Sequence, residues 1–200
     1  MNRINRGFTL MELLIVIGVL GILAAGLLAA IDPFEQLKKA RDTNNRSAAI
    51  EFLGASQRYY ATHGYLPWYK ETVSGTFDCD GTDTQIPLLR TADSTTPWSA
   101  VPVNKPTATA HNAQMKTCVD DTLGVDGEIK STFFDGLATT LYVVSGGTTK
   151  VKVCFPPEGK SNISDGQTSY SIDDLAAPTA VSSACSDADR LLGKCLQCFE

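Results

Sequence analysis

The sequence predicts an α+β fold, in which a long N-terminal α-helix precedes a small antiparallel β-sheet head with long loops. An uncharged run from Leu13 to Ile31 predicts that the first half of the helix spans a membrane, and an amphipathic pattern continues the helix to Thr62. Alternating apolar and polar residues within 141–155, and six cysteines that all follow residue 65, predict the head.

The composition excludes several classes of protein. The 200 residues include 17 Lys and Arg against 22 Asp and Glu, for a formal net charge of -5. Nucleic-acid binding depends on a basic surface, so we predict no nucleic-acid partner. With 16 Gly, 9 Pro and aromatic residues throughout, the chain is not collagen-like, a coiled coil or fully disordered.

The uncharged run is long enough to cross a bilayer. As a helix, Leu13 to Ile31 measures roughly 28 Å, close to the ~30 Å hydrocarbon core of a membrane. Three interpretations are open: a secretory signal cleaved near Ala24-Ala25-Gly26, a permanent anchor, or a segment that first spans the membrane and later takes another role.

Glu12 stands at the beginning of this run. A carboxylate that faces hydrocarbon costs about 2.5–3.5 kcal/mol, so such a residue needs a partner. No Lys, Arg or His lies between Gly7 and Asp32. A cut after Gly7 supplies a cation, because Phe8 then carries a free amine one helical turn from Glu12. The alternative is that Glu12 lies near the bilayer edge and extends its carboxylate into water.

The residues around this glutamate carry a family resemblance. The string Gly7-Phe8-Thr9-Leu10-Met11-Glu12-Leu13-Leu14-Ile15-Val16-Ile17 resembles the signal of type IV prepilins and of the pseudopilins of type II secretion. The resemblance implies that a prepilin peptidase cuts after Gly7 and methylates the new amine of Phe8. It also implies that Glu12 neutralises the N-terminal amine of a neighbouring subunit during assembly.

The same resemblance implies two locations. Before assembly, the protein is expected in the cytoplasmic membrane as a single span with its head outside, in contact with lipid, the prepilin peptidase and an inner-membrane assembly platform. Afterwards it is expected in a cell-surface or periplasmic filament, with copies of itself and other pilins. The pilin fold also requires that the second half of the helix packs on the sheet.

A new helix start follows the span. Asp32 is a capping residue, Pro33 suits the first helical position, Glu35 completes a capping box, and Gly64 is a stop signal. One arc of this helix carries the residues expected to be buried, namely Ala49, Phe52, Leu53, Ser56, Tyr59 and Tyr60. The opposite arc carries Ser47, Glu51, Arg58 and Thr62.

Charges of both signs crowd the beginning of this segment. They are Asp32, Glu35, Lys38, Lys39, Arg41, Asp42 and Arg46. They are expected either to pair between neighbouring subunits of a filament or to form a solvated face with weak pairs.

The head begins near residue 65. Two strands are predicted at Leu141–Ser145 and Thr148–Phe155, joined by a Gly-Gly hairpin. The proline-containing stretch from Thr91 to Gln114 predicts an extended surface loop. A short helix is predicted to begin at Ser186 and stop at Gly193.

All six cysteines lie in the head, and an even number in an exported domain predicts disulfides. They are Cys79, Cys118, Cys154, Cys185, Cys195 and Cys198. Their pairing is open on sequence grounds, and the spacing of Cys195 and Cys198 also suits half of a zinc site or a redox pair. A terminal disulfide that closes the last segment onto the sheet would resemble the C-terminal loop of many pilins.

Sites for other chemistry are sparse. Asp78, Asp80 and Asp83 give the oxygen density of a calcium loop without the EF-hand spacing, and a solvated acidic turn is the alternative. We predict no other cofactor and no further metal site. Motifs of hydrolases and phosphate loops are missing, so the sequence predicts no enzyme.

These observations predict four segments: a leader at 1–7, a membrane-spanning or filament-core helix at 8–31, an amphipathic helix at 32–64 and a head at 65–200. The predicted function is that of a structural subunit of a type IV pilus or a related filament. The alternatives are a pseudopilin of type II secretion, a minor pilin that primes assembly, or a membrane-anchored binding domain that never polymerises.

Overall fold

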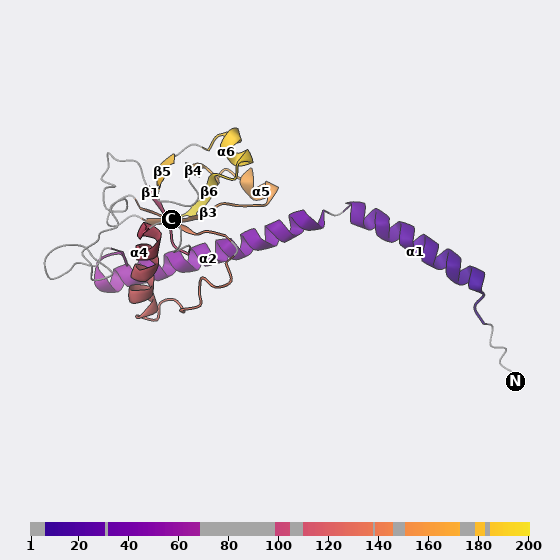
Figure 1. Ribbon diagram of the computed structural model, residues 1–200, viewed down its shortest axis with the longest axis horizontal. Helices are drawn as coiled ribbons and strands as arrows, with labels where there is room; N and C mark the ends of the chain where they lie inside the picture. Colours follow the sequence, from indigo (N-terminus) through magenta and orange to yellow (C-terminus); the bar gives the residue numbers. More distant parts are fainter. Residues whose placement is uncertain are drawn as a thin grey trace. The chain divides into compact units, whose positions relative to one another are not determined.

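The computed structural model describes residues 7–30, 32–68, 99–104, 110–137, 139–145, 151–172, 179–182 and 185–200. The helical elements are α1 (Leu10–Ala30), α2 (Pro33–His63), α4 (Ala110–Val119), the π-helical turn η1 (Asp120–Gly124), α5 (Lys160–Ile163) and α6 (Asp187–Leu191). The strands are β1 (Ser99–Pro102), β2 (Tyr142–Ser145), β3 (Val151–Phe155), β4 (Tyr170–Ile172), β5 (Thr179–Ser182) and β6 (Cys195–Phe199) (Figure 1). The chain divides into two compact units, Met1–Leu37 and Lys38–Glu200.

Local capping signals set both ends of α2, as predicted. The Asp32 carboxylate accepts hydrogen bonds from the backbone N–H groups of Phe34 (3.1 Å) and Glu35 (3.2 Å). At the other end, Gly64 adopts a left-handed φ of 81° and its N–H donates to the Tyr60 carbonyl at 2.8 Å. A side chain disfavours that backbone conformation, so glycine ends the helix here.

One face of α2 forms the floor of the head core. Its buried residues are Asp42, Asn45, Ala48, Ala49, Phe52, Leu53, Ala55, Ser56 and Tyr59. Four of the predicted arc residues that are apolar belong to the main hydrophobic cluster, and the opposite arc is exposed. The helix therefore packs on the sheet through the face that its periodicity predicts.

The strands of the described residues form an antiparallel sheet in the order β1-β2-β3-β6-β4-β5, which closes on itself because β5 also pairs with β1. The two predicted strands pair as β2 and β3, with Val143 opposite Val153, whereas the predicted Gly-Gly turn and residues 148–150 lie outside the described residues. Closure removes the exposed sheet edges that otherwise invite pairing with another chain.

Two apolar clusters occupy the two faces of this sheet. Val143 and Val153 belong to the cluster that includes α2, whereas Tyr142 and Val144 belong to a second one with Ile172 and Leu196. Successive strand residues point to opposite faces, so β2 is apolar at consecutive positions because both of its faces are buried.

The predicted loop from Thr91 to Gln114 is partly wrong. Within it, Ser99–Pro102 forms β1 and α4 begins at Ala110, while 91–98 and 105–109 lie outside the described residues. The strand forms because Val101 is fully buried and because β1 completes the closed sheet between β2 and β5. These partners are distant in sequence, so local composition does not reveal them.

The predicted C-terminal helix is confirmed as α6. The Ser186 hydroxyl accepts a hydrogen bond from the Asp189 N–H at 3.1 Å, and Gly193 follows the helix with a φ of 67°. Ser186 is thus the N-cap of α6, and the glycine provides the left-handed residue that ends it.

Candidate functional site

The beginning of α1 is built around Thr9 and Glu12. The Glu12 Oε2 atom accepts hydrogen bonds from the Thr9 N–H (2.9 Å) and the Thr9 Oγ1 (2.8 Å), and the Glu12 N–H donates to Thr9 Oγ1 at 3.2 Å. This reciprocal arrangement is a capping box, which satisfies N–H groups that the helix itself leaves without acceptors. Sequence reasoning missed the role of Thr9, although the Thr-x-x-Glu spacing is the signal for it.

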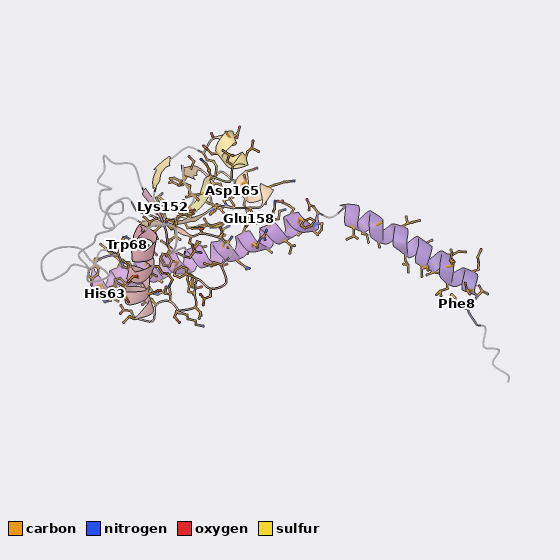
Figure 2. All side chains as sticks on the ribbon, in the orientation of Figure 1. Phe8, His63, Trp68, Lys152, Glu158 and Asp165 are labelled. Carbon is orange, nitrogen blue, oxygen red and sulfur yellow. A yellow bond between two sulfur atoms is a disulfide. The ribbon has the colours of Figure 1, made fainter. Side chains whose placement is uncertain are left out.

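The helix that follows is apolar on every side. Leu10–Leu28, 19 residues, is long and apolar enough to cross a membrane, and none of it is buried. Even its least exposed large side chain, Val16, is 46% exposed, and Phe8 is 81% exposed (Figure 2). A uniformly apolar exposed helix needs lipid or other protein around it.

Gly7 and Phe8 precede the helix as exposed, non-helical residues. A Cβ atom at Gly7 meets nothing within 4 Å, and Gly7 is not among the glycines with a left-handed φ. The conformation of this segment therefore does not itself require glycine at position 7.

The comparison with protein families adds the decisive observation. Residues 2–28 match the model of the prokaryotic N-terminal methylation motif. This chain carries a prepilin-type signal. It is the cleavage and methylation signal of type IV pilins and pseudopilins, whose members are structural subunits. No curated protein and no solved structure matches the chain.

The prepilin-type signal and the fold agree. A long apolar N-terminal helix, a second helix and a small curled antiparallel sheet with disulfides form a pilin-like α+β fold. The signal implies processing by a prepilin peptidase, and the exposed apolar helix fits membrane anchoring before assembly.

Of the seven charged residues between 32 and 46, three interact within the head of their own subunit. For Asp42, the expectation of either subunit pairing or a solvated face is wrong. Asp42 is 1% exposed and accepts hydrogen bonds from the N–H groups of Glu158 (2.9 Å) and Gly159 (2.8 Å) and from Asn162 Nδ2 (2.8 Å). Arg41 forms a 2.5 Å ion pair with Glu158. The third residue, Arg46, lies over the ring of Phe199, 5.3 Å from its centroid.

The cysteines form disulfides rather than a Cys-x-x-Cys site. Cys154 pairs with Cys198 across β3 and β6, and Cys185 pairs with Cys195. Cys195 and Cys198 are three residues apart on one strand and so point to opposite faces, which prevents them from meeting in a zinc or redox pair. Cys118 is also disulfide-bonded, and Cys79 lies outside the described residues.

The described residues hold no group of three or more potential metal ligands. The calcium candidates Asp78, Asp80 and Asp83 lie outside them, so their arrangement stays a prediction.

In the described part of the head, two ionisable groups have pKa values that the structure shifts. Burial, together with a hydrogen bond to Tyr65, raises the pKa of Tyr59 well above its usual range. Burial lowers the pKa of Lys152, but hydrogen bonds to Glu200 (2.7 Å) and the Tyr170 hydroxyl (2.9 Å) outweigh it, and the net pKa is raised. At neutral pH the fold therefore favours a neutral Tyr59 and a charged Lys152.

Proposed function

We propose that this protein is a structural subunit of a type IV pilus or a related filament, cut after Gly7, methylated on Phe8 and assembled through α1. The prepilin-type signal over residues 2–28, set on an apolar helix without buried residues, carries the proposal. The subunit waits in the cytoplasmic membrane with its head outside, until an assembly platform transfers it into a filament. There, copies of itself and other pilins replace the lipid around α1.

Gly7 supports the proposed cleavage position. The local conformation does not require a glycine there, since a Cβ atom would meet nothing within 4 Å. Recognition by another protein explains the glycine instead, and that protein is the prepilin peptidase, which binds the exposed segment before α1.

Glu12 supports the proposed assembly step. Thr9 donates both of its hydrogen bonds to Oε2, and among the described residues no hydrogen bond reaches Oε1. This second oxygen remains for the methylated amine of Phe8 in a neighbouring subunit. Pairing there offsets the cost of about 2.5–3.5 kcal/mol that an ionised carboxylate carries in hydrocarbon.

N-terminal sequencing of the protein from the producing cells tests the processing. We expect N-methylated Phe8 as the first residue. A first residue beyond Gly26 would show cleavage as an ordinary secretory signal and would refute the proposal.

Variants of the capping box test the assembly step. Glu12→Leu is expected to insert and to be cut normally but to yield no filaments in the sheared surface fraction. Glu12→Gln keeps an oxygen for Thr9 but lacks the charge, whereas Thr9→Ala keeps the charge and costs the helix about 0.5–2 kcal/mol of cap. If the charge matters, Glu12→Gln fails to assemble while Thr9→Ala still does. Normal assembly of Glu12→Leu and Glu12→Gln contradicts the mechanism.

A further inference from the structure

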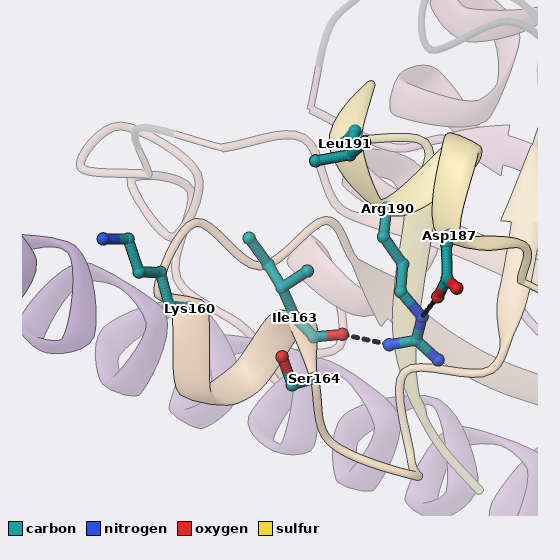
Figure 3. A pocket seen from close by; sticks show the side chains of 6 residues that line it. All are labelled: Lys160, Ile163, Ser164, Asp187, Arg190 and Leu191. Atoms are coloured by element: carbon teal, nitrogen blue, oxygen red, sulfur yellow. Dashed lines mark hydrogen bonds and ion pairs between the residues drawn. The ribbon is translucent and has the colours of Figure 1, made fainter.

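The head has a groove between α5 and α6. Its volume is about 470 Å³, and its lining consists of Lys160, Ile163, Ser164, Asp187, Arg190 and Leu191 (Figure 3). Arg190 is fixed at its edge, since its guanidinium donates to the Ile163 carbonyl and lies 4.0 Å from the Asp187 carboxylate. The groove thus combines an apolar surface with two cations and one carboxylate on its lining.

The apolar surface of this groove extends onto exposed leucines. Leu191 is 90% exposed and the adjacent Leu192 is 66% exposed. The disulfide between Cys185 and Cys195 brackets α6, which holds this surface on the sheet. Leu191 therefore adds exposed apolar area to the groove lining, and the neighbouring Leu192 leaves a second apolar side chain in water at the end of α6.

A complementary projection lies elsewhere on the same head, at the turn after η1. Val125 is 76% exposed and stands beside Asp126, and Asp121 is exposed on η1. The turn is held by two interactions with α2: Arg58 pairs with Glu128 at 2.6 Å, and His63 lies 3.4 Å from Asp126. Within the described part of the chain, Asp121 forms no ion pair.

The groove and the turn are attached at different levels of α2. The segment that leads into α5 is bound by Asp42 and Arg41, whereas the turn is bound by Arg58 and His63. Residues 42 and 58 are separated by roughly 24 Å along the helix axis. In Figure 1, α5 and α6 lie toward the N-terminal end of α2, and α4, which precedes η1, lies toward its C-terminal end.

We propose that the groove between α5 and α6 receives the Val125 turn of a second copy of this chain, in a head-to-tail contact. Val125 packs against Ile163 and Leu191, and the acidic residues beside it face Lys160 and Arg190. The inference rests on the proposed filament function and names the head surfaces that meet. Two different patches on one subunit make a heterologous contact, which generates a ring where its rotation closes and an open helical filament where it does not, and the proposed filament corresponds to the second case.

Cysteine cross-linking in sheared fibres tests this contact directly. In the Val125→Cys/Leu191→Cys variant of the full chain, mild oxidation is expected to yield a ladder of dimers, trimers and higher species on non-reducing gels. The two single variants serve as matched controls and are expected to stay monomeric. Monomers alone in the double variant, or dimers in either single variant, would overturn the head-to-tail assignment.

Charged substitutions provide a second measurement. Val125→Asp and Leu191→Asp are each expected to lower the yield of surface fibres at least about tenfold, because a charge then enters the apolar centre of the contact. Thr132→Asp adds the same charge at an exposed site outside both surfaces and is expected to assemble normally. Protease resistance of the membrane-bound subunit checks that each variant is folded.

The two proposals fail in different ways. If the wild-type chain forms no fibres, the filament function fails, and this contact fails with it. If fibres form and require Glu12, but Val125→Asp and Leu191→Asp assemble like wild type, only the head-to-tail contact is refuted.

Discussion

Removing the Asp42 carboxylate tests how strongly its hydrogen bonds hold α2 on the rest of the head. In Asp42→Ala, the N–H groups of Glu158 and Gly159 and the amide of Asn162 lose their acceptor in a region where Asp42 is only 1% exposed. A buried donor left without an acceptor costs about 1–3 kcal/mol, and water can partly replace the carboxylate at the half-buried Glu158 and Asn162 donors, which reduces the sum. We therefore expect a loss of about 3–5 kcal/mol, a large share of the 5–15 kcal/mol that stabilises a typical domain.

The assay is urea unfolding of the full chain in detergent, followed by tryptophan fluorescence, to which the buried Trp68 contributes. With an m-value of about 2 kcal/mol per molar urea, the expected loss lowers the midpoint by about 1.5–2.5 M. Glu51→Ala is the matched control, because it removes an exposed carboxylate from the same helix and should change the stability by less than about 0.5 kcal/mol. If both variants unfold at the same urea concentration, the Asp42 interactions do not hold the helix.

Two further predictions concern the same head. The Cys154–Cys198 disulfide joins residues 44 apart and Cys185–Cys195 joins residues 10 apart, so loop entropy predicts losses of about 4 and about 2.7 kcal/mol when each pair is replaced by serines; the opposite ranking of urea midpoints would contradict this account. The pKa of Tyr59 is raised in the fold, so its stabilising effect is complete below the usual value of 10.0 and is lost as the pH rises through the folded pKa. Tyr59→Phe should therefore flatten the fall in stability above pH ~10 by up to about 1.4 kcal/mol per pH unit, and an unchanged slope in urea titrations would refute this.

The parts of the fold that depend on local signals could be predicted from the sequence. Asp32, Pro33 and Gly64 bound α2 because capping involves residues within one turn of the helix end. The β2–β3 hairpin is equally local. β1 could not be predicted, since it is four residues long, ends in Pro102 and exists through pairing with residues at least 40 positions away along the chain.

The same contrast between local and long-range signals applies to the residues of the candidate site. The prepilin-type signal is a contiguous string, so the sequence alone points to Gly7, Phe8 and Glu12. The residue type of Asp42 predicts a solvated or intersubunit charge, although its position is in line with Asn45, Ala49 and Phe52 at the spacing of the buried face. The cysteine pairs depend on which strands become neighbours, and that order emerges only when the sheet closes.

Glu12 and Asp42 differ in how fully their carboxylates are bound within their own subunit, and this difference limits which of them can pair with a second subunit. Both oxygens of the buried Asp42 carboxylate are bound by donors of its own head, so Asp42 supplies no contact to a second copy without weakening the head. Glu12 shares only one oxygen with its own helix. Polar recognition between subunits is therefore expected at Glu12, where an amine meets the second oxygen, and on the surface of the head, at the groove beside Arg190.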